Sequence, residues 1–135
     1  MRLAELGRDF WELRSAERSH EDHPETFSIP PRKARENLKR GQAAKLIFDI
    51  EGTDEDGSIV VQGERMWVIV SERVGDTYVG ILDAQPQCLE PSDDVYLCFG
   101  AEIAFQAEHV IDIDTPPEDY AESQLRQPPE RRWLR

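Results

Sequence analysis

Cysteine and histidine are scarce in this sequence, whose 135 residues include two cysteines and three histidines. Cys88 and Cys98 lack the spacing of a metal-binding pair, and two cysteines are too few for the disulfide framework of a small secreted domain. We therefore expect two reduced thiols in a cytoplasmic protein. A disulfide between them is the alternative.

Long apolar runs are absent as well. No run approaches the ~20 apolar residues that a membrane-spanning helix needs. Glu5 and Asp9 interrupt the N-terminal segment, which would be apolar in a signal peptide. The sequence therefore predicts a cytoplasmic chain without a membrane partner.

Positive charge is in short supply, because 28 Asp and Glu residues outnumber 16 Lys and Arg residues and leave a net charge of −12. Such a surface repels nucleic acids, whose binding depends on Lys and Arg displacing counterions, and it repels anionic membranes. It suits a basic protein partner, whose approach it would steer. Solubility alone is the alternative explanation.

Sequence signatures of catalysis are missing too. The chain has no Gly-x-Ser-x-Gly motif and no glycine-rich phosphate loop before a helix. The acidic run at residues 54–56 lacks the alternating ligands and the terminal Glu of a calcium loop. A metal held by His20 and His23 stays an alternative to a polar helix end or loop. We predict no cofactor, no metal ion and no catalytic residue.

Apolar side chains recur at helical spacing near the N-terminus, which predicts a helix within residues 2–18. They are Leu3, Leu6, Phe10 and Leu13. Residues 19–24 are too polar to continue this helix. Further helices are predicted over residues 31–40 and, after a capping-box spacing, over residues 116–126. Residues 127–135 show no periodicity, and we expect a loose tail there.

Alternating apolar residues predict strands from residue 43 onward. In residues 43–50, one face is apolar and the other carries Lys45 and Asp49. Gly63 is expected to form a bulge, and the strand that follows it has apolar side chains on both faces, which predicts a central strand covered on both sides. The other extended segments are expected at residues 59–62, 64–71, 77–82, 102–105 and 109–113.

Together these elements predict an α+β fold with a curved, mostly antiparallel sheet of five to six strands. The sheet is expected to be partly barrel-like, with two or three peripheral helices. Residues 1–114 are expected to form a single α+β domain, with an N-terminal helical segment at 1–26 and a sheet core at 27–114. Residues 115–135 would add a short helix and the loose tail.

The segment Gly-Glu-Arg-Met-Trp-Val at residues 63–68 concentrates the candidate binding residues. On a strand, Arg65 and Trp67 share a face and can stack cation on ring, whereas Glu64 points to the other face. Together with Lys45 and His109, they predict a small polar and aromatic binding surface. The alternative is that Trp67 fills the core and the charged residues lie at the rim of the sheet.

Glu-Arg-Met-Trp-Val at residues 64–68 is also the most specific of several motifs that extend over most of residues 27–114. The others are Phe-Ser-Ile-Pro-Pro-Arg at 27–32, Leu-Lys-Arg-Gly-Gln-Ala-Ala-Lys-Leu-Ile-Phe at 38–48, Gly-Ile-Leu-Asp at 80–83, Gly-Ala-Glu-Ile-Ala-Phe at 100–105 and His-Val-Ile-Asp-Ile at 109–113. With them the chain resembles the YegJ-like bacterial domain of unknown function, which is distantly similar to toxin-immunity-type domains. The resemblance implies a small α+β domain with a strongly bent antiparallel sheet, and no known catalytic residues or cofactor.

We therefore expect a non-enzymatic protein-binding module of the bacterial cytoplasm with an unknown, basic protein partner. A more specific form of this expectation is an immunity-like protein. The alternative is a small-ligand binder or an enzyme that uses a pocket near Lys45, Arg65, Trp67 and His109. A homodimer formed through an exposed edge strand stays open.

Overall fold

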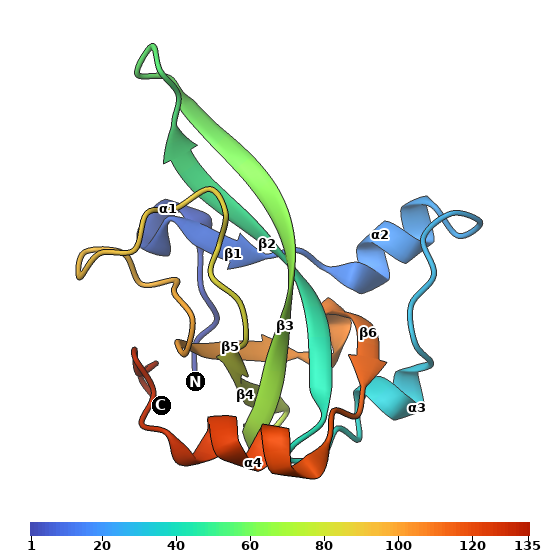
Figure 1. Cartoon of the computed structure of the whole chain (residues 1–135). Helices are drawn as coiled ribbons and strands as arrows, with labels where there is room; N and C mark the ends of the chain where they lie inside the picture. The colour runs from blue at the N-terminus through green and yellow to red at the C-terminus, as the bar shows by residue number, and fades with distance from the viewer.

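A curved antiparallel sheet is the frame of the molecule (Figure 1). The computed structural model describes residues 1–135. The six strands run in the order β1-β2-β3-β4-β5, and β6 pairs with β2 on the edge that β1 also uses. The sheet curls into a half-barrel with short helices around it, so the predicted α+β class is confirmed. The elements are α1 (Leu6–Asp9), β1 (Trp11–Leu13), α2 (Ala16–Asp22), α3 (Arg32–Arg35), β2 (Ala43–Thr53), β3 (Ile59–Val74), β4 (Thr77–Leu82), β5 (Glu102–Gln106), the 3₁₀ turn η1 (Ala107–His109), β6 (Val110–Asp114) and α4 (Glu118–Arg126).

The inner face of the sheet carries the core. The even-numbered side chains of β2 from Ala44 to Ile50 are at most 2% exposed, which confirms the predicted alternation. On β3, Ile69 is buried on the opposite face, whereas Trp67 on that face is half-buried. The central strand is therefore covered on both sides over only part of its length.

β2 and β3 form a long two-stranded arm that projects beyond the rest of the sheet (Figure 1). The bulge predicted at Gly63 is wrong, because this residue lies in register opposite Asp49 and β3 runs through it without a break. The glycine has another role: a Cβ atom there would lie 2.8 Å from a guanidinium nitrogen of Arg14, which donates to Asp49. Gly63 therefore leaves room for an ion pair across the outer face of the arm.

The N-terminal segment is not the continuous helix predicted within residues 2–18. α1 stops after one turn at Phe10, whose backbone is left-handed (φ +68°), and β1 follows directly. Trp11 is 2% exposed, because pairing with β2 places its ring in the core. Burial of this ring outweighs a local helical pattern, as tertiary packing commonly does. α2 then begins after Ser15 and takes in residues 19–22, which the sequence predicts to be non-helical.

The C-terminal segment is docked onto the body of the protein. α4 confirms the helix predicted over residues 116–126, but the loose tail predicted after it is wrong. Trp133 is 7% exposed, and its ring centroid lies 5.3 Å from that of Tyr96 and 5.8 Å from that of Trp11. Arg135 pairs with the buried carboxylate of Glu102. These aromatic contacts join three segments that lie far apart in the sequence.

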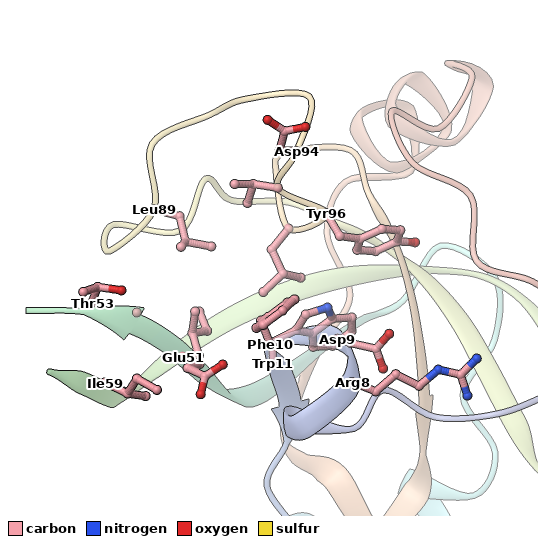
Figure 2. Close-up of a pocket in the computed structure, with 14 residues that line it drawn as sticks. Arg8, Asp9, Phe10, Trp11, Glu51, Thr53, Ile59, Leu89, Asp94 and Tyr96 are labelled. Carbon is pink, nitrogen blue, oxygen red and sulfur yellow. The ribbon is translucent and has the colours of Figure 1, made fainter. Parts of the chain in front are cut away.

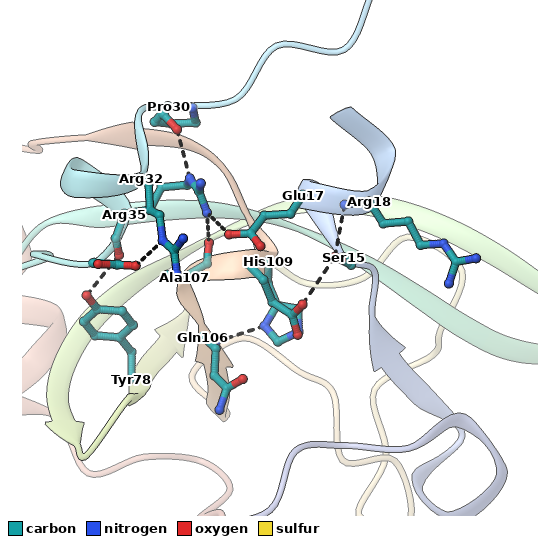
Figure 3. A network of polar contacts seen from close by, with 12 residues as sticks. Ser15, Glu17, Arg18, Pro30, Arg32, Arg35, Tyr78, Gln106, Ala107 and His109 are labelled. Carbon is teal, nitrogen blue, oxygen red and sulfur yellow. Dashed lines mark hydrogen bonds and ion pairs between the residues drawn. The ribbon is translucent and has the colours of Figure 1, made fainter. Parts of the chain in front are cut away.

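A buried arginine holds the helices beside the sheet (Figure 3). Arg35 is 5% exposed, and its guanidinium donates to the carboxylate of Glu17 (2.7 Å) and to the carbonyl oxygens of Pro30 (2.9 Å) and Ala107 (2.8 Å). The Tyr78 hydroxyl donates to the Arg35 carbonyl (3.0 Å). α3 is only four residues long, so the helix that the sequence predicts over residues 31–40 is much shorter than expected. None of the helices combines the length and the apolar character needed to cross a membrane.

Candidate functional site

The upper part of β3 has one free edge. β2 pairs with β3 from Ile59 onward, whereas β4 on the other side pairs only from Val68 onward. In an antiparallel pair, the N–H and C=O groups of alternate residues point to the same neighbouring strand. Val70 donates to Gln42 (2.9 Å) and accepts from Gly41 (2.9 Å), the two residues directly before β2. The even-numbered residues of β3 therefore face β2.

The odd-numbered residues of β3 direct their backbone groups away from β2. The carbonyl of Trp67 is satisfied, because it accepts from the N–H of Asp83 (3.0 Å). Four residues farther up the arm have outward-facing N–H and C=O groups without a partner in the protein. An edge of this kind accepts a further strand. The four residues are Ile59, Val61, Gly63 and Arg65.

Apolar and acidic side chains flank this edge. Ile59 is 71% exposed and Val61 is 50% exposed, both large for apolar side chains. The turn that joins β2 to β3 carries the exposed run Asp-Glu-Asp at residues 54–56. Glu51 lies directly opposite Val61 across the arm. The arm thus presents apolar side chains and unpaired backbone groups in a negatively charged setting.

An apolar groove of ≈ 480 Å³ lies between the arm, the N-terminal segment and the loop between β4 and β5 (Figure 2). Phe10 and Trp11 line one side, Ile59 comes from the arm, and Leu89 and Tyr96 come from the loop between β4 and β5. Ile59 lines the groove and also belongs to the free edge, so the two candidate surfaces meet at this residue.

Two residues in the groove carry an unfavourable feature. Phe10 is a non-glycine residue in the left-handed region, which costs about 1 kcal/mol, and it is also 64% exposed. The indole N–H of Trp11 is buried without an acceptor, which costs about 1–3 kcal/mol. Strain and unpaired buried groups concentrate at functional sites, so both features favour binding at this groove.

Lys45 and Arg65 line a second, polar pocket of ≈ 260 Å³ together with Asp112. The predicted stacking of Arg65 on Trp67 is wrong. The ammonium nitrogen of Lys45 lies 5.7 Å from the Trp67 ring centroid, while the Arg65 guanidinium lies 5.8 Å from the Phe27 ring centroid. Lys45 reaches Trp67 because the two residues are directly opposite each other across the β2–β3 pair.

Glu64 secures the loop that covers the groove. Its carboxylate accepts from the backbone N–H groups of Gln87 (2.8 Å) and Cys88 (3.1 Å). Burial acts to raise the pKa of Glu64, but hydrogen bonds from the Cys88 thiol and from these N–H groups outweigh burial and lower the pKa. Burial and the Glu64 carboxylate raise the pKa of Cys88 to about 11. The thiol is therefore protonated at neutral pH and a poor nucleophile.

His109 has a structural partner of its own. It is 4% exposed, and its Nδ1 atom accepts from the N–H of Gln106 (2.9 Å). Burial lowers the pKa of His109 against the opposing effect of Glu108 and Glu17, so the imidazole is neutral at pH 7. His109 does not line the pocket of Lys45 and Arg65, and neither does Trp67. The structure thus brings together two of the four residues from which the sequence predicts a pocket.

Comparisons with known proteins add no identification, since no protein-family model, curated protein or solved structure matches the chain.

The groove and the free edge escape the sequence analysis for different reasons. The sequence pattern predicts that Phe10 and Trp11 belong to a helix, and this prediction gives no indication that they lie beside the arm. The length of the free edge depends on the residue of β3 at which pairing with β4 begins. The sequence of β3 alone does not indicate this residue. One signal is present in the sequence: Ile59 and Val61 are apolar residues that closely follow an acidic turn.

Proposed function

We propose that this chain is a protein-binding module that captures an extended segment of a basic partner along the free edge of β3. The observation that carries the proposal is the run of outward-facing backbone groups at residues 59–65 that have no partner. Strand addition gives affinity through main-chain hydrogen bonds and specificity through alternate side chains. Ile59 and Val61 offer the apolar contacts.

Charge supports a basic partner. The tip of the arm is Asp-Glu-Asp, Glu51 lies beside the edge, and the chain carries a net charge of −12. Complementary charge raises the rate of association and selects against acidic partners. The groove next to the arm, at ≈ 480 Å³, has room for an apolar side chain of the same partner.

A bacterial cytoplasmic location is part of this proposal and is supported by the two free thiols, as is usual in reducing compartments. Membership of the YegJ-like family is likewise proposed on the motifs that the chain shares with it. Neutralisation of a basic toxin is the specific role that follows from the likeness to immunity-type domains.

A synthetic strand tests the mode of binding. The probe is a peptide of four Lys-Val repeats, and the control is the matching peptide of four Glu-Val repeats. In amide hydrogen exchange followed by NMR, the Lys-Val peptide is expected to protect the N–H groups of Val61, Gly63 and Arg65. The N–H groups of Val60 and Gln62 already face β2 and should not change. Equal effects of both peptides, or no added protection, would contradict the proposal.

Proline substitution distinguishes the contribution of the backbone N–H to peptide binding from that of the side chain. Val61→Pro removes an outward-facing N–H and spares the pairing with β2, which is the position where an edge strand tolerates proline. It is expected to abolish peptide binding in a correctly folded arm. Val61→Thr keeps the N–H and serves as the matched control, with binding retained at a few-fold lower affinity. If both variants bound equally well, strand addition would be ruled out.

A further inference from the structure

Two cationic side chains line one pocket on the outer face of the sheet. Lys45 on β2 and Arg65 on β3 line the same polar pocket of ≈ 260 Å³. Neither side chain takes part in an ion pair within the protein. In a chain with 28 acidic residues against 16 basic ones, two cations in one pocket that form no ion pair need a reason.

Aromatic rings hold both cations in place. Lys45 lies over Trp67, and Arg65 lies over Phe27. A cation–π contact orients a charged group without neutralising it. The segment that carries Phe27 is itself tied down, because a ring nitrogen of His20 lies 2.6 Å from the Phe27 carbonyl oxygen. The two positive charges are therefore positioned before any ligand arrives.

Asp112 sets the charge that the pocket accepts. It lines the pocket and lies opposite Lys45 across the β2–β6 pair. Two cations and one carboxylate give a local charge of +2 − 1 = +1. A monoanion brings this local charge to zero, whereas a dianion leaves an excess negative charge beside Asp112. Ile111 and Phe27 add apolar surface to the lining.

We propose that this pocket binds a small monocarboxylate. The guanidinium of Arg65 and the ammonium of Lys45 bind the carboxylate oxygens, and Ile111 and Phe27 contact the apolar part of the ligand. The site differs from the proposed strand addition in the groups that it uses, which are side chains on the outer face and not the backbone groups of the edge, although Arg65 contributes to both.

Benzoate tests the site, with neutral benzamide as the matched ligand of nearly the same shape. Both are titrated into labelled protein and followed by NMR, with the indole N–H of Trp67 as the reporter next to Lys45. Benzoate is expected to give saturable shifts at Lys45, Arg65 and Trp67. Lys45→Gln and Arg65→Gln should each weaken binding about tenfold, and Asp112→Asn should strengthen it about threefold.

Two further variants control for charge alone. Lys33→Gln makes the same charge change as Lys45→Gln at an exposed position on α3. Asp114→Asn matches Asp112→Asn, because each carboxylate accepts from the N–H of the next residue (2.8 Å and 2.9 Å) on the same strand. The inference is overturned if benzamide binds as well as benzoate, if inorganic phosphate binds more tightly, if a control variant has the effect of its partner, or if no saturable shift occurs.

Discussion

At the scale of single residues, two neighbouring residues of the groove have features that lower the stability of the fold. Phe10 holds a left-handed backbone and exposes most of its ring, and the neighbouring Trp11 buries an indole N–H without an acceptor. Neither feature helps folding, since each has an unfavourable free energy. Both are understandable if the groove is a contact surface and the fold tolerates their cost.

Phe10→Gly tests whether stability and binding conflict at this position. Glycine adopts a positive φ without steric cost, so the variant is expected to gain up to about 1 kcal/mol in the free energy of unfolding, measured by urea denaturation. The same variant loses an exposed ring beside the arm and should bind the Lys-Val peptide more weakly. A variant that is clearly less stable than the parent would show that the Phe10 ring serves packing.

Glu102 makes stability depend on pH. Burial acts to raise its pKa, but hydrogen bonds from Arg135 and from the N–H of Trp133 outweigh burial and lower the pKa below the ordinary 4.5. The folded state therefore gains from this carboxylate above about pH 4.5, and the gain is lost as the pH falls through the lower, folded pKa.

Glu102→Gln is expected to lower the free energy of unfolding by about 2 kcal/mol at pH 7, because the amide keeps one acceptor oxygen but loses the negative charge and places a donor NH2 group where the second oxygen accepts from Arg135. Below the folded pKa of Glu102 the parent carboxyl is itself neutral, so the difference between the two proteins should shrink. Urea denaturation at neutral and acidic pH measures both values. An equal difference at both pH values would contradict the assignment.

At the scale of elements, the sequence predicts the sheet well and its ends poorly. The alternation in β2 and the hairpin between β3 and β4 follow from local periodicity and turn residues, and both are present. β1 and the docked tail depend instead on aromatic contacts between distant segments, which local patterns do not encode. The same reasoning accounts for the site: Lys45 and Arg65 share a face, as strand alternation requires, whereas His109 is buried and lines a different pocket.

Substitution of Trp133 tests how much the C-terminal tail contributes to the free energy of unfolding. Trp133→Ala removes a ring that is 7% exposed and packed on Tyr96 and Trp11, so the free energy of unfolding should fall by about 3 kcal/mol in urea denaturation. The adjacent Leu134→Ala is the control, because Leu134 is 82% exposed and its loss should change stability by less than about 0.5 kcal/mol. Similar small effects for both variants would mean that the tail is not part of the core.

At the scale of the whole molecule, charge and shape favour the same partner. The chain carries a net charge of −12. Its β2–β3 arm projects from the body of the protein and has one unpaired edge (Figure 1). The negative field brings a basic chain to the surface, and the edge then gives it a specific register. The monocarboxylate pocket lies on the outer face of the same sheet and has the opposite local charge.

The salt dependence of the binding rates distinguishes electrostatic steering of the Lys-Val peptide from its hydrogen bonding at the edge. The association rate of the Lys-Val peptide should fall about tenfold as salt rises from about 0.05 to 0.5 M, because screening shortens the reach of the negative field. The dissociation rate depends on the short-range hydrogen bonds of the edge and should change much less. Stopped-flow kinetics over this range gives both rates. A salt effect confined to dissociation would contradict electrostatic steering.

The most direct test of the central claim is photo-crosslinking in a lysate of the native cells from a probe placed at residue 61, on the free edge of β3. The account predicts one basic protein crosslinked from this position, competed away by the Lys-Val peptide, and absent when the probe is at the exposed residue 33 on α3. A product that is a second copy of this chain, an acidic protein, or the same set of proteins from both positions would contradict capture of a basic strand by the arm.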